Sequence, residues 1–157
     1  MLPEVTESLY ALPCGPNYNL VIVPVNLNNP DSILEMAQIL CLKHEISQIN
    51  VAVANAGICD YYGPLVEMTD YDLWIYLEVN TFRLLSLFRG LLPFLRESRH
   101  QPKFVYVLTE LASLARLEQN RASLTNIYSM SNAAGNYMIR RLYFKHEELT
   151  IFAVNPR

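Results

Sequence analysis

Short runs of apolar residues alternate along this chain with longer segments of helical period. Four apolar runs have the length and composition of buried strands: residues 20–25, 49–54, 104–108 and 149–154. Between them, apolar residues recur every three or four positions over residues 33–42, 70–92 and 126–142, which places them on one face of a helix. Regular alternation of strand and helix predicts an α/β fold, a parallel sheet with helices on both faces.

Proline and capping residues indicate where these elements end. Pro24 places the first predicted strand at or near a sheet edge, because proline cannot donate a ladder hydrogen bond. Thr69 and Asp70 are predicted to cap a long helix, and Pro93 to kink or end it. Before Asn17, the chain reads as the tail of a helix followed by a turn.

Composition indicates a globular protein and excludes several classes. The 157 residues are 52% hydrophobic and 17% charged, enough for one domain with a sizeable core. The net charge is −3 and basic residues are scattered, so neither nucleic-acid nor membrane-surface binding is expected. No apolar run reaches the ~18 residues of a membrane span, and the three histidines lack metal-ligand spacing.

The cysteines and the start of the chain bear on the cellular compartment. Cys14, Cys41 and Cys59 are odd in number and irregularly spaced, so we expect small buried hydrophobes rather than disulfides. No signal-peptide pattern opens the chain. A reduced, cytoplasmic protein is therefore expected.

Candidate chemistry gathers after the predicted strands. The segment Asn55-Ala56-Gly57 follows strand 49–54, and Tyr128 begins the helix that follows strand 104–108. Open α/β sheets build their sites where the carboxyl ends of parallel strands meet. Gly57 would allow a ligand to approach the backbone closely, and Asn80, within an apolar helix, needs a hydrogen-bond partner if it is buried.

These segments together resemble the short-chain dehydrogenase/reductase family, most of all its fungal norsolorinic acid ketoreductase-like branch. The matching segments are Asn55-Ala56-Gly57, Glu78-Val79-Asn80-Thr81, Tyr128-Ser129-Met130-Ser131-Asn132 and Phe152-Ala153-Val154-Asn155-Pro156. The family's active-site motif is Tyr-x-x-x-Lys; Tyr128 matches it, and Asn132 stands at the Lys position. The resemblance implies a Rossmann-like doubly wound parallel sheet, and residues 1–157 would be a single partial NAD(P)-binding domain.

The resemblance also implies catalytic roles. Tyr128 would give a proton to a carbonyl oxygen, Thr109 or Ser113 would hydrogen-bond the same oxygen, and Asn80 would complete a proton relay. In the family, the Lys charge lowers the tyrosine pKa from its ordinary value of about 10. Asn132 carries no charge, so it would be a weakened ribose contact and a large loss of activity is expected.

The implied cofactor is NADP or NAD. Its expected contacts are Asn26, Leu27, Asn55, Ala56, Gly57, Asn132 and Pro156. Asn26-Leu27 matches the family's adenine-binding pair, with Asn in place of Asp; an ordinary loop asparagine explains it equally well. The chain has only five glycines and lacks the family's Gly-rich pyrophosphate loop.

The resemblance covers only the middle of a family member, which leaves alternatives open. The first strand–helix–strand unit and the C-terminal substrate region have no counterpart, so the sheet would be truncated, with unpaired edges. The chain is then an NAD(P)H-dependent ketoreductase for a polyketide-like or aromatic ketone, a catalytically inactive relative, or a mis-bounded gene product. In each case, helices 70–96 and 126–146 would suit a homodimer or pairing with an intact relative.

Overall fold

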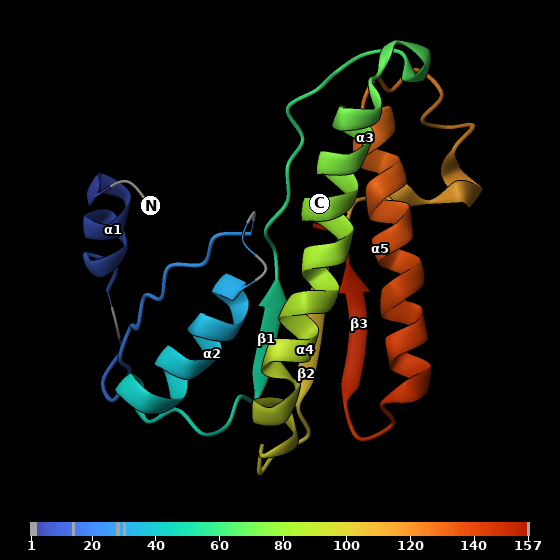
Figure 1. The fold of residues 1–157 in the computed structure, drawn as a ribbon. Helices are drawn as coiled ribbons and strands as arrows, with labels where there is room; N and C mark the ends of the chain where they lie inside the picture. Colours follow the sequence, from blue (N-terminus) through green and yellow to red (C-terminus); the bar gives the residue numbers. More distant parts are fainter. Residues whose placement is uncertain (1–2, 14, 28, 30, 157) are drawn as a thin grey trace. The chain divides into compact units, whose positions relative to one another are not determined.

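The computed structural model describes residues 3–13, 15–27, 29 and 31–156 and divides into two compact units, residues 1–46 and 47–157 (Figure 1). The first unit contains helices α1 (Pro3–Tyr10) and α2 (Asp31–His44). Residues 20–25 have no regular secondary structure, so the strand predicted there is wrong. An apolar run becomes a strand only when a neighbour satisfies its backbone groups. Among the described residues no strand pairs with this segment.

A three-stranded parallel sheet forms the centre of the second unit. Its strands are β1 (Val51–Ala54), β2 (Lys103–Val107) and β3 (Thr150–Val154), in the order β1-β2-β3. Ala52 pairs with Phe104, which pairs with Ile151. These strands lie within the predicted runs or one residue beside them, so the predicted parallel α/β sheet is confirmed.

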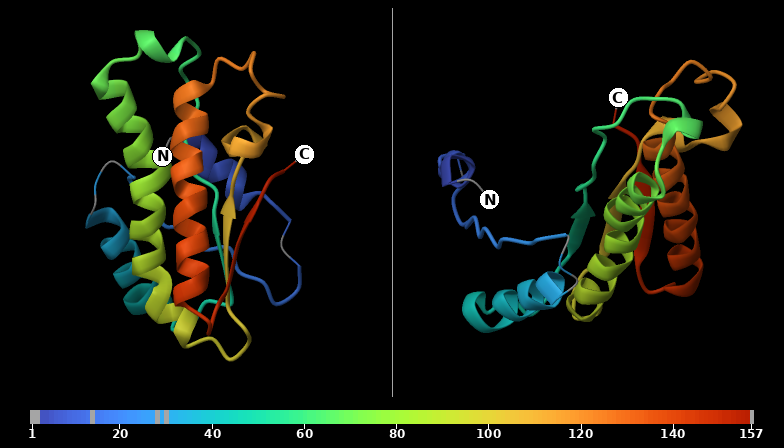
Figure 2. Two further views of the ribbon diagram at one scale, coloured as in Figure 1. Left: turned by 90° about the vertical axis from the view of Figure 1, so that its right-hand side faces the viewer. Right: turned by 45° about the horizontal axis from the view of Figure 1, so that its top comes forward.

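Alternation along the strands buries one face of this sheet. Ala52, Phe104, Tyr106 and Ile151 are at most 6% exposed. Helices α4 and α5 lie side by side over this face (Figure 2). The ring of Phe88 on α4 meets the ring of Phe104 edge-on, with centroids 5.0 Å apart. This layer supports the strand ends at which the candidate site lies.

The long helix predicted over residues 70–96 is continuous and contains a π-helical turn. It consists of α3 (Asp70–Leu77), the π-helical turn η2 (Glu78–Phe82) and α4 (Arg83–Arg96). Thr69 caps it as predicted: its hydroxyl accepts from the Asp72 N–H at 3.2 Å, and the Asp72 carboxylate accepts from the Thr69 N–H at 3.0 Å. Pro93 does not end the helix, which continues to Arg96.

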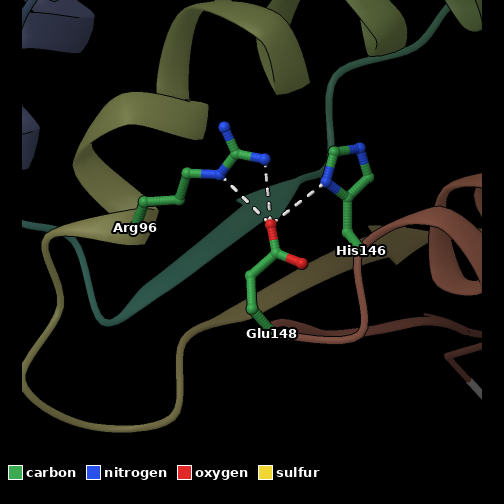
Figure 3. Close-up of polar contacts among 3 residues, drawn as sticks. All are labelled: Arg96, His146 and Glu148. Carbon is green, nitrogen blue, oxygen red and sulfur yellow. Dashed lines mark hydrogen bonds and ion pairs between the residues drawn. The ribbon is translucent and has the colours of Figure 1, made fainter.

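At the amino-terminal edge of the sheet, an ion-pair cluster joins α4 to the turn after α5 (Asn126–Lys145). Glu148 Oε1 accepts from Arg96 Nε at 3.1 Å and Nη2 at 3.0 Å, and lies 3.4 Å from His146 Nδ1 (Figure 3). A backbone hydrogen bond, followed by Arg96 and His146, holds the pKa of Glu148 below its ordinary value. Because the Glu148 side chain is 45% exposed, the cluster orders the turn without contributing much stability.

The three cysteines were expected to be buried, and the structure describes two of them. Cys41 is exposed, so its predicted burial is wrong: it lies in the second half of α2, whose buried residues are all in the first half, Ser32 to Ala37. Cys59 is half-buried, and Cys14 lies outside the described residues.

None of the described helices has both the length and the apolar character to cross a bilayer. In the described part of the chain, no three metal-ligating side chains cluster.

Candidate active site

The carboxyl edge of the sheet holds a cavity of about 200 Å³. It is lined by residues 55–59, Asn80, Tyr106, Val107, Tyr128 and Asn132. Six of the residues singled out in the sequence meet there: Asn55, Ala56, Gly57, Asn80, Tyr128 and Asn132. None of the lining residues is Asp, Glu, Lys, Arg or His, so the cavity suits an uncharged, hydrogen-bonding group.

Asn80 connects three parts of this site from the π-helical turn. Its Oδ1 accepts from the Ile58 N–H at 2.8 Å, and its Nδ2 donates to the Ile58 carbonyl at 3.1 Å and to Ser131 Oγ at 3.0 Å. A Cβ on Gly57 would lie 3.1 Å from Asn80 Oδ1. Because Gly57 has no Cβ, the Asn80 side chain can approach the loop after β1 closely enough to hold it against the helix.

The first turns of α5 are attached to the same π-helical turn. The Thr81 hydroxyl donates to the Ser131 carbonyl at 2.8 Å, and the Ser131 hydroxyl donates to the Tyr128 carbonyl at 2.9 Å. Ser131 is fully buried. These bonds fix the backbone that carries Tyr128 relative to the strand ends.

Tyr128 is half-buried, and its hydroxyl is neutral at physiological pH. Burial, followed by electrostatic interaction with Cys59, raises its pKa above the ordinary value. A nearby cation would shift the pKa in the opposite direction, and no cationic side chain lines this cavity. Tyr128 can therefore donate a hydrogen bond but is poorly set up to become a phenolate.

Asn132 is buried, and both ends of its amide are engaged inside the protein. Nδ2 donates to the Tyr128 carbonyl at 2.9 Å, and Oδ1 accepts from the Tyr106 hydroxyl at 2.8 Å. Burial raises the pKa of Tyr106 to about 12, which keeps that hydroxyl a donor. Sequence reasoning missed Tyr106; a tyrosine inside a buried strand, whose hydroxyl requires a partner, was the available signal.

The two alternative carbonyl-binding residues lie outside this cavity. Thr109 caps a short 3₁₀ turn, accepting from the Leu111 N–H at 3.3 Å. Thr109 and Ser113 line a separate cavity of about 410 Å³ together with Asn155. Neither is brought to Tyr128 by a hydrogen bond between described residues, so their catalytic role stays a prediction.

The remaining cofactor residues are also outside the cavity lining. Asn26 and Leu27 belong to the first unit, where the Asn26 N–H donates to Ser32 Oγ at 2.8 Å. Pro156 is exposed and follows β3. Their proposed cofactor contacts stay predictions.

A larger cavity, about 620 Å³, lies beside another face of α5. Asn126, Ser129 and Met130 line it from the helix, and residues from the loop 111–123 close it. It contains neither Tyr128 nor Asn80. Its size does not make it the better candidate, because the smaller cavity holds the groups that can exchange protons.

Comparison with known proteins decides the family. No family model matches the chain. It is 30% identical over 152 residues to norsolorinic acid ketoreductase of Aspergillus parasiticus, covering 96% of this chain. It is 33% identical over 156 residues to a short chain dehydrogenase of Penicillium aethiopicum, covering 98% of this chain. The chain belongs to the short-chain dehydrogenase/reductase family.

Solved structures agree with this assignment. The NADPH-bound carbonyl reductase from chicken fatty liver superposes with a TM-score of 0.81 at 25% identity, over 97% of this chain and 61% of that one. The carbonyl reductase Sniffer of Drosophila melanogaster has the same fold, with a TM-score of 0.75 at 20% identity, over 86% of this chain and 58% of its own. This short-chain dehydrogenase/reductase chain spans 56% and 61% of the two curated fungal relatives' lengths.

Proposed function

We propose that this chain contributes the site of an NAD(P)H-dependent ketoreductase acting on a small ketone, with Tyr128 as the proton donor. The observation that carries the proposal is the neutral Tyr128 hydroxyl in an uncharged cavity beside Asn55-Ala56-Gly57. The family supports a carbonyl as the reacting group. The fungal relatives support an aromatic or polyketide-like ketone.

The cavity suits the uncharged end of a nicotinamide cofactor. Asn55, the backbone at Gly57 and the Tyr128 hydroxyl offer hydrogen bonds of the kind that a ribose or a carboxamide uses. When bound, the nicotinamide supplies hydride to the carbonyl carbon. Asn26 and Leu27 are proposed to contact the adenine, and Pro156 is proposed as a further cofactor contact.

Tyr128 would donate its proton to the ketone oxygen as the carbonyl carbon gains hydride, which leaves a phenolate that solvent reprotonates. Thr109 or Ser113 would supply a second hydrogen bond to that oxygen. Each unit by which the Tyr128 pKa exceeds its ordinary value makes proton loss about 1.4 kcal/mol harder. We therefore propose a slow reductase, because Asn132 supplies no charge to offset this penalty.

A single-turnover assay tests the proposal. Excess protein is mixed with NADPH and an aromatic ketone, and the loss of NADPH absorbance is followed. Slow reduction is expected in the unmodified chain and none in Tyr128→Phe, whose circular dichroism should be unchanged. Equal rates in the two proteins, or no reduction by a folded chain, would reject Tyr128 as proton donor.

A non-catalytic partner is the second candidate, favoured by the helix surfaces. Aromatic side chains that are 41–71% exposed lie on the long helix and on α5: Tyr71, Trp74, Phe82, Tyr137, Tyr143 and Phe144. Arg140 lies over the rings of Tyr143 and Phe144, at 5.1 and 4.7 Å. Such surfaces support a homodimer through helices 70–96 and 126–146.

A further inference from the structure

The Tyr106 hydroxyl lies between the two helices that build the site. It donates to Asn132 Oδ1 at 2.8 Å and lies 3.3 Å from the Asn80 carbonyl. Tyr106 and Asn132 are 3% and 4% exposed. A hydrogen bond buried to this degree is expensive to leave unmade, so the two side chains depend on each other.

Gly135 provides the space for this arrangement. A Cβ at this position would lie 2.8 Å from the Tyr106 hydroxyl oxygen and 3.0 Å from its Cε1. Neither approach is tolerated without movement of the ring. Helix α5 thus accommodates Tyr106 in two ways. Asn132 accepts its hydrogen bond, and Gly135, which has no side chain, leaves room for its ring.

The space around Asn132 is therefore closed by Tyr106. The asparagine amide already spans the distance from the Tyr106 hydroxyl to the Tyr128 carbonyl. A longer side chain at position 132, in the same direction, would meet the Tyr106 hydroxyl.

We propose that Tyr106 is a positioning residue that holds Asn132 inward and excludes a cationic side chain at position 132 from the Tyr128 hydroxyl. The inference rests on the proposed function only in treating Tyr128 as the proton donor. Placing a positive charge against the Tyr128 hydroxyl would therefore require changes at both position 106 and position 132.

One consequence is that Asn132→Lys by itself fails to activate Tyr128. The ammonium is held at the Tyr106 hydroxyl rather than against the Tyr128 hydroxyl, so it stabilises the phenolate less than it would in direct contact. Shortening position 106 opens the space, so that a Lys at 132 can extend to Tyr128, as i and i+4 side chains on one helix face do.

The test is an NMR titration of Tyr128 in four cofactor-free proteins: the unmodified chain, Asn132→Lys, Tyr106→Val and the double variant. Tyrosine is labelled with ¹³C at its hydroxyl-bearing carbon, and Tyr128→Phe identifies the signal. The Tyr128 pKa is expected to stay above about 10 in the unmodified chain and in Asn132→Lys. In the double variant the acid dissociation constant should rise at least roughly tenfold.

Two results overturn the proposal. One is a drop in the Tyr128 pKa in Asn132→Lys as large as that in the double variant; the other is no drop in a folded double variant. Because no cofactor is present, the outcome is independent of whether the chain binds NADPH. Failure of NADPH binding would reject the proposed function and leave this result standing.

A double-mutant cycle covers the case in which the double variant does not fold. Tyr106→Phe should lower the folding equilibrium constant by about tenfold when Asn132 is present. In the Asn132→Leu background the same change should have an effect at least about fivefold smaller, since the shorter of the two Tyr106 hydrogen bonds is gone and only the longer one to the Asn80 carbonyl remains. Equal effects in both backgrounds would show that the two positions are not coupled.

Discussion

At the scale of single residues, Asn80 carries much of the site's geometry. Its side chain makes three hydrogen bonds, two to Ile58 and one to Ser131, from a position that is 3% exposed. Asn80→Ala leaves the Ile58 N–H without this acceptor, and we expect a loss of about 3 kcal/mol in the free energy of unfolding. Urea denaturation measures it.

Asn136→Ala is the matched control for that change, because Asn136 is an exposed asparagine on α5. Its effect should be within about 0.5 kcal/mol. Similar values for the two variants would contradict the role assigned to Asn80.

Tyr106 predicts a pH dependence of stability. Burial raises its folded pKa to about 12, above the ordinary value of about 10. The neutral hydroxyl therefore contributes stability that is fully present below pH ~10 and is lost as the pH rises towards ~12, at most about 3 kcal/mol. The stability difference between the unmodified chain and Tyr106→Phe should shrink across that window. A difference that stays constant from pH 9 to 12 would contradict the buried, neutral Tyr106.

The sequence was informative for some site residues and silent on others. Asn55-Ala56-Gly57 and Tyr128 follow parallel strands, and the ends of such strands must converge, so their meeting could be predicted. The bond between Tyr106 and Asn132 could not, because it depends on how far β2 lies from α5. In the sequence, Tyr106 is one more large residue in an apolar run.

At the scale of elements, the predictions hold where a segment has a partner. The runs at 49–54, 104–108 and 149–154 form strands because each pairs with a neighbour. The run at 20–25 has equal apolar character but no paired strand among the described residues. Whether a segment forms a strand depends on a pairing partner as well as on the segment's own sequence pattern.

Helix α5 offers a test of how closely it is fitted to β2. In a helix interior alanine is favoured over glycine by about 1 kcal/mol, and Gly135 has no positive φ that would penalise the change. We nevertheless expect Gly135→Ala to destabilise the protein by roughly 1–3 kcal/mol, because its Cβ would meet Tyr106.

The sign of that effect should reverse when Tyr106 is replaced by valine, which removes the ring. Thermal unfolding of the unmodified chain, Gly135→Ala, Tyr106→Val and the double variant measures the effect of Gly135→Ala with and without the tyrosine ring. Stabilisation by Gly135→Ala in the presence of Tyr106 would mean that the contact is loose.

At the scale of the whole molecule, association is expected through the long helix and α5. Tyr137, on α5, is 70% exposed. Introducing a charge there with Tyr137→Glu should weaken a homodimer at least roughly tenfold, because a buried unpaired carboxylate is costly. Tyr18→Glu, at an equally exposed tyrosine outside these helices, is the control. Sedimentation velocity would contradict the dimer by showing a monomer at all concentrations, or equal effects of the two variants.

Cofactor binding is a property of the whole chain, and a fluorescence titration of NADPH into the purified protein measures it. We expect saturable binding in the micromolar range that is lost in Ala56→Trp, which fills the cavity, and kept in Leu114→Trp, because Leu114 does not line it. No saturable binding by a chain whose circular dichroism shows it folded would rule out NADPH as a ligand of this chain. Unchanged binding in Ala56→Trp would rule out this cavity as its site.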